Sequence, residues 1–448
     1  MHNRGYQFGG SNHRQRSIMN LEVEAALGMS RKWNAREAGR EVAETAIKNL
    51  TLPPDFFLLF STIHYEKYGG FQEFLNGVWD ILPKKTPLIG GTVPGFINNY
   101  GCFSRGTSAL AVSCPSMDVV VGVGRNTKRN PHRAAKRCTE MIQNGLKESP
   151  YKNKFLLNFI SGPVMPSIPG LGQKKYIRSG FISKFAIQAL NLSQVLVQKG
   201  LAREDEVFEE TVKQLPDYQM ILGTSMDDYR GMKNYQFFND EVLTNSVVNL
   251  GLATDLNLDV HTTHGMKETD QNFTITKLGA GNHAICKIDG KPAVPELLRL
   301  LDWPEGFLNE ETMLHTILYY PISLKRNGRA VPVVMPLIMK DYIIVPCIID
   351  DGKVSILTVS GKDLINAVKE NLQYFDRIQP EFGLFSTCVT ILQTLGHRTN
   401  IVQEELCKYF KDKSFLLFYS AGEGTYSQTE DMTYANMSFN TAVFGHRN

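Results

Sequence analysis

The stretch "LLFYSAGEG" (residues 416–424) holds the pattern that decides the fold. Its first four residues are apolar, as expected of a buried strand. Three small residues follow this apolar run, and the acid Glu423 then stands between two glycines. Related stretches, in which an apolar strand also ends in small or hydroxyl-bearing residues, occur twice more in the chain. The sequence therefore predicts that one structural unit is repeated.

Each copy of the unit has the order strand, helix, strand, small-residue turn, strand. Such an order predicts parallel pairing of the first two strands, because a helical crossover returns the chain to the same end of the sheet. We therefore expect an α/β (α+β) fold, with mixed sheets built from repeated strand-helix-strand-strand units and flanked by helices. The second copy carries an extra helix over about 183–199. The strands that open the two halves of each copy are "FFLLFST" (56–62) and "TPLIGGTVPG" (86–95), "FLLNFISG" (155–162) and "YQMILGTSMDD" (218–228), and "FGLFSTC" (382–388) and "SFLLFYSAGEG" (414–424).

The composition is that of a soluble globular protein. The 448 residues include 48 basic and 45 acidic side chains, and the net charge of +3 gives no strong general attraction to nucleic acid or anionic lipid. The N-terminal residues are polar and basic without an apolar core, and no apolar run is long enough to span a membrane. The 7 cysteines form no Cys-x-x-Cys pair, which indicates a reducing compartment. We expect a cytoplasmic protein.

Residues 1–50 are expected to form an N-terminal extension with one helix. Gly, Asn, Arg and Gln dominate residues 1–31, whereas alanines throughout about 34–50 favour a helix. Pro53 and Pro54 end this helix, because proline cannot continue one.

Small residues at the ends of the parallel strands indicate where a ligand would bind. In parallel α/β sheets, ligands lie just beyond the carboxyl ends of the strands, and small residues there allow close approach to the backbone. We expect the three sets of strand ends to line one hollow. The alternative is that these small residues only mark the points where strands pass into loops, as they commonly do. The candidate ligand-binding residues are Gly90, Gly91 and Thr92 in the first copy, Gly223, Thr224, Ser225, Asp227 and Asp228 in the second, and Ser386, Cys388, Gly422 and Glu423 in the third.

Two further motifs resemble cofactor or metal sites, but their context favours other interpretations. "LGAGNHA" (278–284) has the outline of a dinucleotide fingerprint, yet its flanks are strand-like, so we expect a hairpin turn. "VHTTH" (260–264) places His261 and His264 three residues apart. In a strand these side chains would point to opposite faces, so hydrogen-bonded histidines are favoured over a metal site. We expect no cofactor and no metal, and we count His264 among the candidate ligand-binding residues.

Cys388 and a basic run of the chain support alternative functions. A nucleophilic cysteine needs a base held close by, and the sequence alone brings no histidine near Cys388. A buried structural thiol is favoured, and a cysteine-dependent hydrolase or transferase using Cys388 is the alternative function. "RNTKRNPHRAAKR" (125–137) predicts a helix that begins at Asn130 and Pro131. A solvated helix face is favoured over nucleic-acid contact, because no aromatic residues interleave the basic ones. A scaffold that binds partners through such a surface is a third possibility.

Taken together, these landmarks resemble the FIST family, a sensory module of signalling proteins. The resemblance covers about residues 51–445, and the order of the motifs carries it. "PLIGGTVPG" and "LGTSMDD" resemble the FIST N part. "GLFSTC" and "LLFYSAGEG", followed by Asn436 and "FNTAVFG", resemble the FIST C part.

The resemblance implies an organisation and a function for the chain. It implies a FIST N-like domain over residues 51–290 and a FIST C-like domain over residues 291–448. It also implies a non-catalytic intracellular sensor that binds a small polar metabolite and signals to a partner protein. Amino acids are the proposed ligands of such modules. On the same ground, Asn436 joins the candidate ligand-binding residues.

Overall fold

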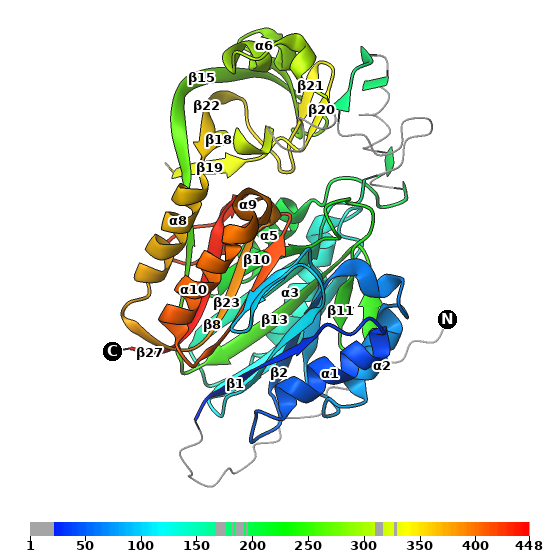
Figure 1. Cartoon of the computed structure of the whole chain (residues 1–448), viewed down its shortest axis with the longest axis vertical. Coiled ribbons are helices and arrows are strands. Elements are labelled where there is room, and N and C mark those ends of the chain that lie inside the picture. Colours follow the sequence, from blue (N-terminus) through cyan, green and yellow to red (C-terminus); the bar gives the residue numbers. More distant parts are fainter. Residues whose placement is uncertain are drawn as a thin grey trace.

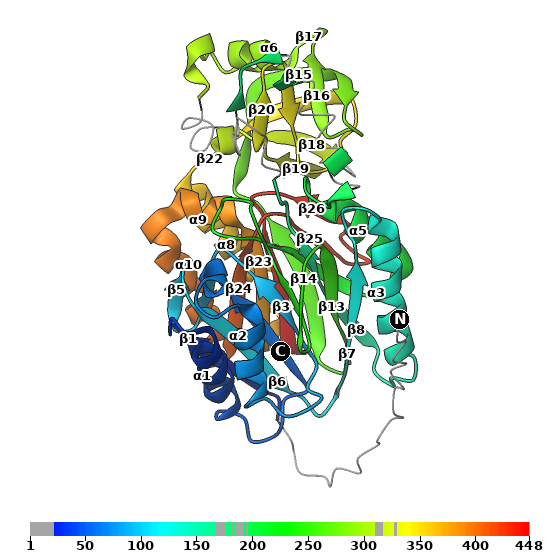
Figure 2. The same cartoon turned by 90° about the vertical axis from the view of Figure 1, so that its right-hand side faces the viewer.

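The computed structural model describes residues 22–165, 176–180, 182–183, 192–193, 196–309, 317–326 and 329–447. Most of the extra helix predicted in the second copy and the first 21 residues of the predicted extension lie outside these ranges. The described residues form three 6-stranded sheets and one 9-stranded sheet. Figures 1 and 2 show a body that holds the three smaller sheets and, at the top of both views, a unit that holds the fourth.

The three sheets of the body follow one plan, which confirms the predicted repeat. In each sheet, two neighbouring strands run parallel, as the crossover pattern requires. The mixed α/β architecture predicted from the sequence is therefore confirmed. The parallel pairs are β2 (Phe56–Ser61) with β3 (Leu88–Thr92), β8 (Asn153–Ser161) with β10 (Gln219–Ser225), and β23 (Ile378–Cys388) with β24 (Ser414–Ser420).

Two antiparallel strands complete one side of each sheet. The strand that ends each unit pairs with the first strand of the parallel pair. The strand that begins the unit pairs with the other edge of this last strand. The strands that begin the units are β1 (Glu24–Ser30), β7 (Met117–Arg125) and β14 (Asn257–Thr263), and those that end them are β6 (Thr107–Ser113), β13 (Ser246–Thr254) and β27 (Phe439–Arg447).

The short hairpin of each unit joins a neighbouring sheet instead of its own. The hairpin after β3 pairs with β24, the hairpin after β10 pairs with β3, and the hairpin after β24 pairs with β10. This exchange links the three units in a ring. The hairpins are β4 (Phe96–Asn98) with β5 (Gly101–Phe103), β11 (Gln236–Phe238) with β12 (Glu241–Leu243), and β25 (Glu423–Tyr426) with β26 (Thr433–Ala435).

Helices cover one face of each sheet, and the opposite faces meet in a shared core. The rings of Phe60, Phe159 and Phe418 lie in this core, and the Phe60 and Phe418 centroids are 4.3 Å apart. Because both faces of the strands are buried, their sequences read as continuous apolar runs. The helices are α1 (Ala35–Ile47) and α2 (Phe71–Trp79) on the first sheet, α3 (Pro131–Gly145) and α5 (Glu204–Gln214) on the second, and α8 (Gly361–Gln373), α9 (Val389–Leu395) and α10 (Thr399–Phe410) on the third.

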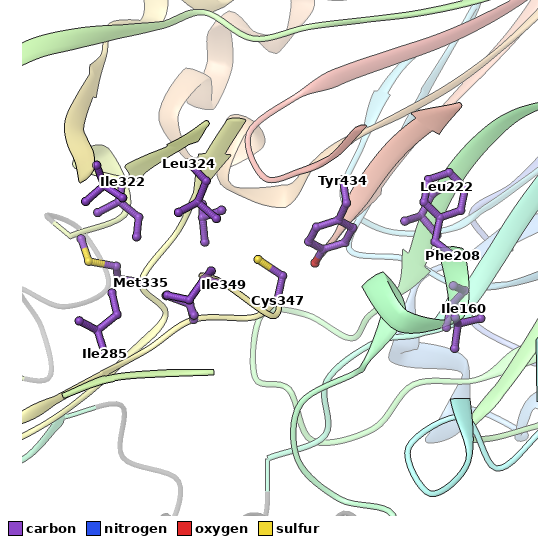
Figure 3. Close-up of a cluster of buried hydrophobic side chains, with 14 of the residues drawn as sticks. Ile160, Phe208, Leu222, Ile285, Ile322, Leu324, Met335, Cys347, Ile349 and Tyr434 are labelled. Atoms are coloured by element: carbon purple, nitrogen blue, oxygen red, sulfur yellow. The ribbon is translucent and has the colours of Figure 1, made fainter. Parts of the chain in front are cut away.

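The third unit contains a long insertion between β14 and α8. Together with β9 (Tyr176–Ile177) of the second unit, the insertion forms the fourth sheet, and it shares a hydrophobic core with the body. Figure 3 shows this continuity, from Ile285 and Met335 of the insertion past Cys347 and Tyr434 to Phe208 of α5. The main elements of the insertion are β15 (Met266–Gly279), β16 (Ala284–Ile288), β17 (Lys291–Pro292), α6 (Ala293–Leu300), β18 (Ile322–Arg326), β19 (Arg329–Val333), β20 (Leu337–Met339), β21 (Tyr342–Ile344) and β22 (Gly352–Val359).

Two features of the structure concern the ends of the expected domains, whose division stays a prediction. Residues 24–30 of the predicted N-terminal extension form β1, which pairs with β6 along its whole length, so this segment belongs to the first sheet. The helix predicted in the extension is confirmed as α1. The boundary expected between residues 290 and 291 falls between β16 and β17, which pair with each other. The insertion therefore crosses that boundary.

Candidate functional site

A cavity of about 160 Å³ lies where the body meets the insertion. On the body side it is lined by residues at the ends of β10, β23 and β24 and at the beginning of α5. Most of the lining side chains are apolar, and a few polar groups are placed among them. An apolar cavity of roughly this volume can hold a benzene ring. Representative lining residues are Glu204, Tyr229, Cys388 and Ala421 of the body and Val334 and Leu337 of the insertion.

Glu204 is the acid that lines this cavity. It is the first residue of α5 and follows Arg203, whose left-handed φ of 59° turns the chain into the helix. The Tyr434 hydroxyl donates to Glu204 Oε1 at 2.8 Å, whereas Oε2 has no hydrogen-bond partner among the described residues. Burial, with the neighbouring Asp205 carboxyl, raises the pKa of Glu204 to about 7. A ligand that donates a hydrogen bond would satisfy the free oxygen.

Glu423 lies behind the cavity wall that Cys388 and Ala421 form. Its carboxyl is fully buried, and neither oxygen has a hydrogen-bond partner within the described part of the chain. Burial raises the pKa of Glu423 well above its ordinary value, and the nearby Glu204 charge adds to this effect. The Ser420 hydroxyl and the Cys388 thiol oppose the rise. Burial therefore favours the protonated form of both acids, and Glu204, with a pKa of about 7, is about half protonated at neutral pH.

The small residues that follow β24 allow the side chains of Glu204 and Tyr434 to pack close to the backbone of this segment. A Cβ atom at Gly422 would lie 2.6 Å from Glu204 Oε1 and 2.7 Å from the Tyr434 hydroxyl oxygen. Any larger residue at Gly422 would push the carboxyl and the phenol aside. Glycine at this position thus makes room for the Glu204–Tyr434 pair beside the cavity.

Hydrogen bonds tie the ends of β10 and β24 together. The amide of Thr224 donates to Ser420 Oγ at 2.8 Å, and the amides of Ala421 and Gly422 each donate to Thr224 Oγ1 at 3.0 Å. Ser386 Oγ donates to the Leu222 carbonyl at 2.7 Å and joins β23 to the same edge. The strand ends of the second and third units therefore form one fixed wall.

The comparison with protein families bears on this arrangement. The family profile described as FIST N domain matches residues 55–291, more than half of the 448 residues. The chain belongs to the FIST family. FIST is a family of sensory domains, which supports a sensory role for the chain. The resemblance of the later part of the chain to FIST C lies beyond this match and stays a prediction.

Solved structures resemble the FIST chain only remotely. A crystal structure of a cyanuric acid hydrolase from A. caulinodans is 8% identical, with a TM-score of 0.32, over 95% of this chain and 100% of that chain. A structure of PurLQS from Thermotoga maritima is 11% identical, with a TM-score of 0.18, over 95% of this chain and 73% of that chain. At these TM-scores neither likeness carries an argument. A comparison with curated proteins finds no significant match.

Several of the residues predicted for a FIST ligand site do come together. Thr224, Ser386, Cys388, Gly422 and Glu423 lie at or directly behind the cavity wall. The amide nitrogen of the Asn436 side chain donates to the Ala421 carbonyl at 3.3 Å, and its oxygen accepts from the Val334 amide at 3.2 Å. Asn436 thus bridges the body and the insertion beside the cavity.

The prediction of one hollow shared by all three sets of strand ends is wrong. Gly90 lies against the Leu59 carbonyl, and a Cβ atom at Gly223 would lie 2.3 Å from the Phe418 ring. Gly91 lies against the Tyr235 carbonyl, and Thr92 Oγ1 accepts from the Tyr235 amide at 3.0 Å. The cores of the sheets fill the space between the units, because these glycines admit backbone and aromatic rings of the protein itself.

Ser225 and the two aspartates of the second unit have structural partners. Ser225 Oγ donates to Asn234 Oδ1 at 2.9 Å. The Asp227 carboxylate accepts from the backbone amides of Gly231 and Met232 at 2.8 and 2.6 Å and so fixes the loop after β10. Asp228 is exposed on the same loop. None of these three residues lines the cavity.

The histidines and the glycine motif have the structures that the sequence favours. His264 Nε2 lies 3.1 Å from the Ala330 carbonyl, and His261 Nδ1 lies 2.8 Å from Glu430 Oε1. The described residues contain no group of side chains suited to a metal ion. His264 does not line the cavity. Residues 278–284 form the hairpin between β15 and β16, with Gly279 opposite Ala284, which confirms the predicted turn.

The basic run forms the predicted helix α3, and it also contains a residue that sequence reasoning missed. Lys128 is buried, and its Nζ atom donates to Ser161 Oγ, the Gly162 carbonyl and Asn245 Oδ1, each at 2.9 Å. Burial lowers the pKa of Lys128 to about 7, and the Glu204 carboxyl opposes this. Within a run of basic residues, no sequence signal separates this lysine from its exposed neighbours.

Glu204 and Tyr434 were also missed by sequence reasoning. In "LAREDEV", Glu204 looks like an ordinary acid in the first turn of a helix, where negative charge is favourable. Tyr434 lies on a short hairpin strand 230 residues away. Only the exchange of hairpins between units brings β26 to the beginning of α5.

No helix among the described residues is long and apolar enough to cross a bilayer.

Cys388 is expected to be unreactive in the folded protein. Burial raises the pKa of its thiol to about 12, and the thiol donates a hydrogen bond to the Thr390 hydroxyl at 3.4 Å. We expect alkylation by iodoacetamide at pH 7 to be on the order of 1,000-fold slower than in urea, because the thiolate is the reactive species. Peptide mass spectrometry measures this ratio. Rapid stoichiometric labelling of Cys388 in the folded state would instead favour the thiol-dependent hydrolase or transferase.

Proposed function

We propose that this chain is a non-catalytic sensor that binds a small polar metabolite in the cavity between the body and the insertion. An amino acid is the first candidate ligand. The main support for the proposal is Glu204, which lines a mostly apolar cavity and whose buried Oε2 atom has no hydrogen-bond partner among the described residues. Buried polar atoms without a partner are rare in folded proteins, and a ligand is one way to satisfy them.

The lining residues suit the three parts of an amino acid. The amino group would donate to Glu204, and the side chain would pack against apolar residues such as Leu337 and Val389. Arg230 also lines the cavity, and its side chain is 68% exposed, so its guanidinium can meet a carboxylate near the opening. This arrangement favours amino acids with apolar side chains over acidic ones.

Ligand binding in this cavity would act on the contact between body and insertion. Residues from both sides line the cavity, so a bound molecule would bridge them. Asn436 and Asp205 already join the two sides, through the amides of Val334 and Ile348. A ligand that strengthens this contact would favour one arrangement of the insertion, which a partner protein could recognise.

A thermal unfolding screen against the common amino acids tests the proposal. At a ligand concentration of 100 times Kd, we expect the free energy of unfolding to rise by about 2.7 kcal/mol, because only the folded chain binds. The expected ligands combine an apolar side chain with a free amino group. The measurement is the shift in melting temperature as a function of ligand concentration.

A matched pair of variants places the effect in the cavity. Ala421→Phe fills space at the lining position, so the ligand-induced shift should disappear, whereas Ala421→Ser should keep it. The melting temperatures of both variants without ligand show whether they fold. A shift that survives Ala421→Phe, or the absence of any shift in the wild type, would mean that this cavity is not the sensory site.

A further inference from the structure

Resting on the proposed function, we infer that the cavity selects organic ammonium compounds with an apolar body, and that binding releases the Glu204 carboxyl proton to solvent. The cation then forms an ion pair with the Glu204 carboxylate. No bond other than the carboxyl O–H is broken, and the proton passes to the buffer. The ligand class and the proton coupling both follow from the groups that surround Glu204.

The free atom at the cavity wall accepts hydrogen bonds once Glu204 is ionised. Glu204 Oε1 is already used by the Tyr434 hydroxyl, so Oε2 is the atom left for a ligand. The glycine at position 422 holds the backbone close against this carboxyl and limits its movement. An ammonium group near Oε2 would supply both a hydrogen-bond donor and a compensating positive charge.

The protein itself offers Glu204 no cation at hydrogen-bonding distance within the described residues. Lys128 is the positive group that influences it, and all three donors of its ammonium are directed to Ser161, Gly162 and Asn245. Of the groups that affect the pKa of Glu204, Lys128 has the smallest effect, and it lowers the pKa. A buried carboxylate without a close cation is costly, so the protonated form is favoured until the pH rises or a ligand supplies a cation.

The other titratable groups around the acid oppose its ionisation or are neutral. Asp205 lies beside it on α5 and raises its pKa, and His283 faces Asp205 from the insertion. Glu423 on β25 would repel a second negative charge. The pKa values of Cys388 on β23 and Tyr434 on β26 are raised by burial, so both groups are neutral at pH 7. At a given pH, an added cation shifts this balance towards the carboxylate.

The sign of the pH dependence follows from these groups. Because the pKa of Glu204 in the free protein is about 7, the carboxyl is mostly protonated at pH 6 and mostly ionised at pH 8. A ligand that binds the ionised form therefore binds about tenfold more tightly at pH 8 than at pH 6. At pH 6 it should release close to one proton per molecule bound.

Benzylamine and benzyl alcohol are suitable probes, because they differ only in the charged group. The ring matches the volume of the cavity, and the aminomethyl group stays charged between pH 6 and pH 8. Isothermal titration calorimetry at pH 6, in two buffers of different ionisation enthalpy, measures the number of protons released. We expect benzylamine to bind at least tenfold more tightly than benzyl alcohol at pH 8 and to release close to one proton at pH 6.

Two glutamine variants identify the source of the proton. Glu204→Gln should lose both the preference for benzylamine and the proton release. Glu209→Gln, an exposed position on the same helix, should behave as the wild type. Equal binding of benzyl alcohol without proton release, or no binding of benzylamine, would overturn the inference. The amino-acid screen decides separately whether the proposed function also fails.

Discussion

Gly124→Val is expected to lower the free energy of unfolding by about 3 kcal/mol or more. A Cβ atom at Gly124 would lie 1.9 Å from the Ala134 carbonyl oxygen and 3.0 Å from its Cα atom. The added side chain of β7 would therefore force α3 away from the sheet, because backbone atoms cannot rotate aside as a flexible side chain can. Urea unfolding followed by circular dichroism measures the loss.

The same substitution is expected to weaken ligand binding, because α3 packs against α5, the helix that begins with Glu204. Gly306→Ala is the matched control, since a Cβ atom there meets no atom within 4 Å. The control should change stability by no more than about 0.5 kcal/mol. A Gly124→Val variant as stable as the control would show that α3 is not held in close contact with β7.

Glu204→Gln is expected to become more stable than the wild type as the pH rises, by about 3 kcal/mol between pH 4 and pH 8. The pKa of Glu204 is about 7 in the folded protein, against an ordinary value of 4.5. The folded wild type therefore keeps a proton that the unfolded chain has lost, and its stability falls across this window. The glutamine has no proton to lose, and its oxygen can still accept from Tyr434.

Urea unfolding of both proteins at a series of pH values measures this difference. The comparison isolates Glu204, because all other titratable groups are common to the two proteins. Below about pH 4 the difference should level off, since the carboxyl is then largely protonated in both states. A difference that stays constant from pH 5 to pH 8 would mean that the Glu204 pKa is not raised, and the proton-coupled inference would fall with it.

Local sequence patterns determined the repeat and its elements. The apolar runs around Phe56, Phe155 and Phe382 are long enough to mark strands buried on both faces, and the intervening periodicity marks crossover helices. Parallel pairing followed from this order alone, because the connection is a helical crossover. The hairpin at 278–284 and the beginning of α3 could also be predicted from the sequence, since glycine, asparagine and proline act through their own backbone preferences.

Long-range contacts decided what those patterns could not. No local signal shows that each hairpin pairs with another unit, nor that the insertion lies beside the ends of β10, β23 and β24. The predicted hollow at Gly90 and Gly223 is filled, because small residues admit protein atoms as readily as a ligand.

From the sequence alone it was possible to predict the strand–helix repeat and the position of Glu423 after a buried strand, and to recognise the resemblance to FIST, since these depend on neighbours along the chain. The three-dimensional fold was needed to show that Glu204, and not Glu423, lines the cavity. The protonation of either acid depends on burial by residues far away in sequence, such as Tyr434 beside Glu204. Burial of this kind is a property of the assembled fold, because desolvation is set by every segment that packs around a group.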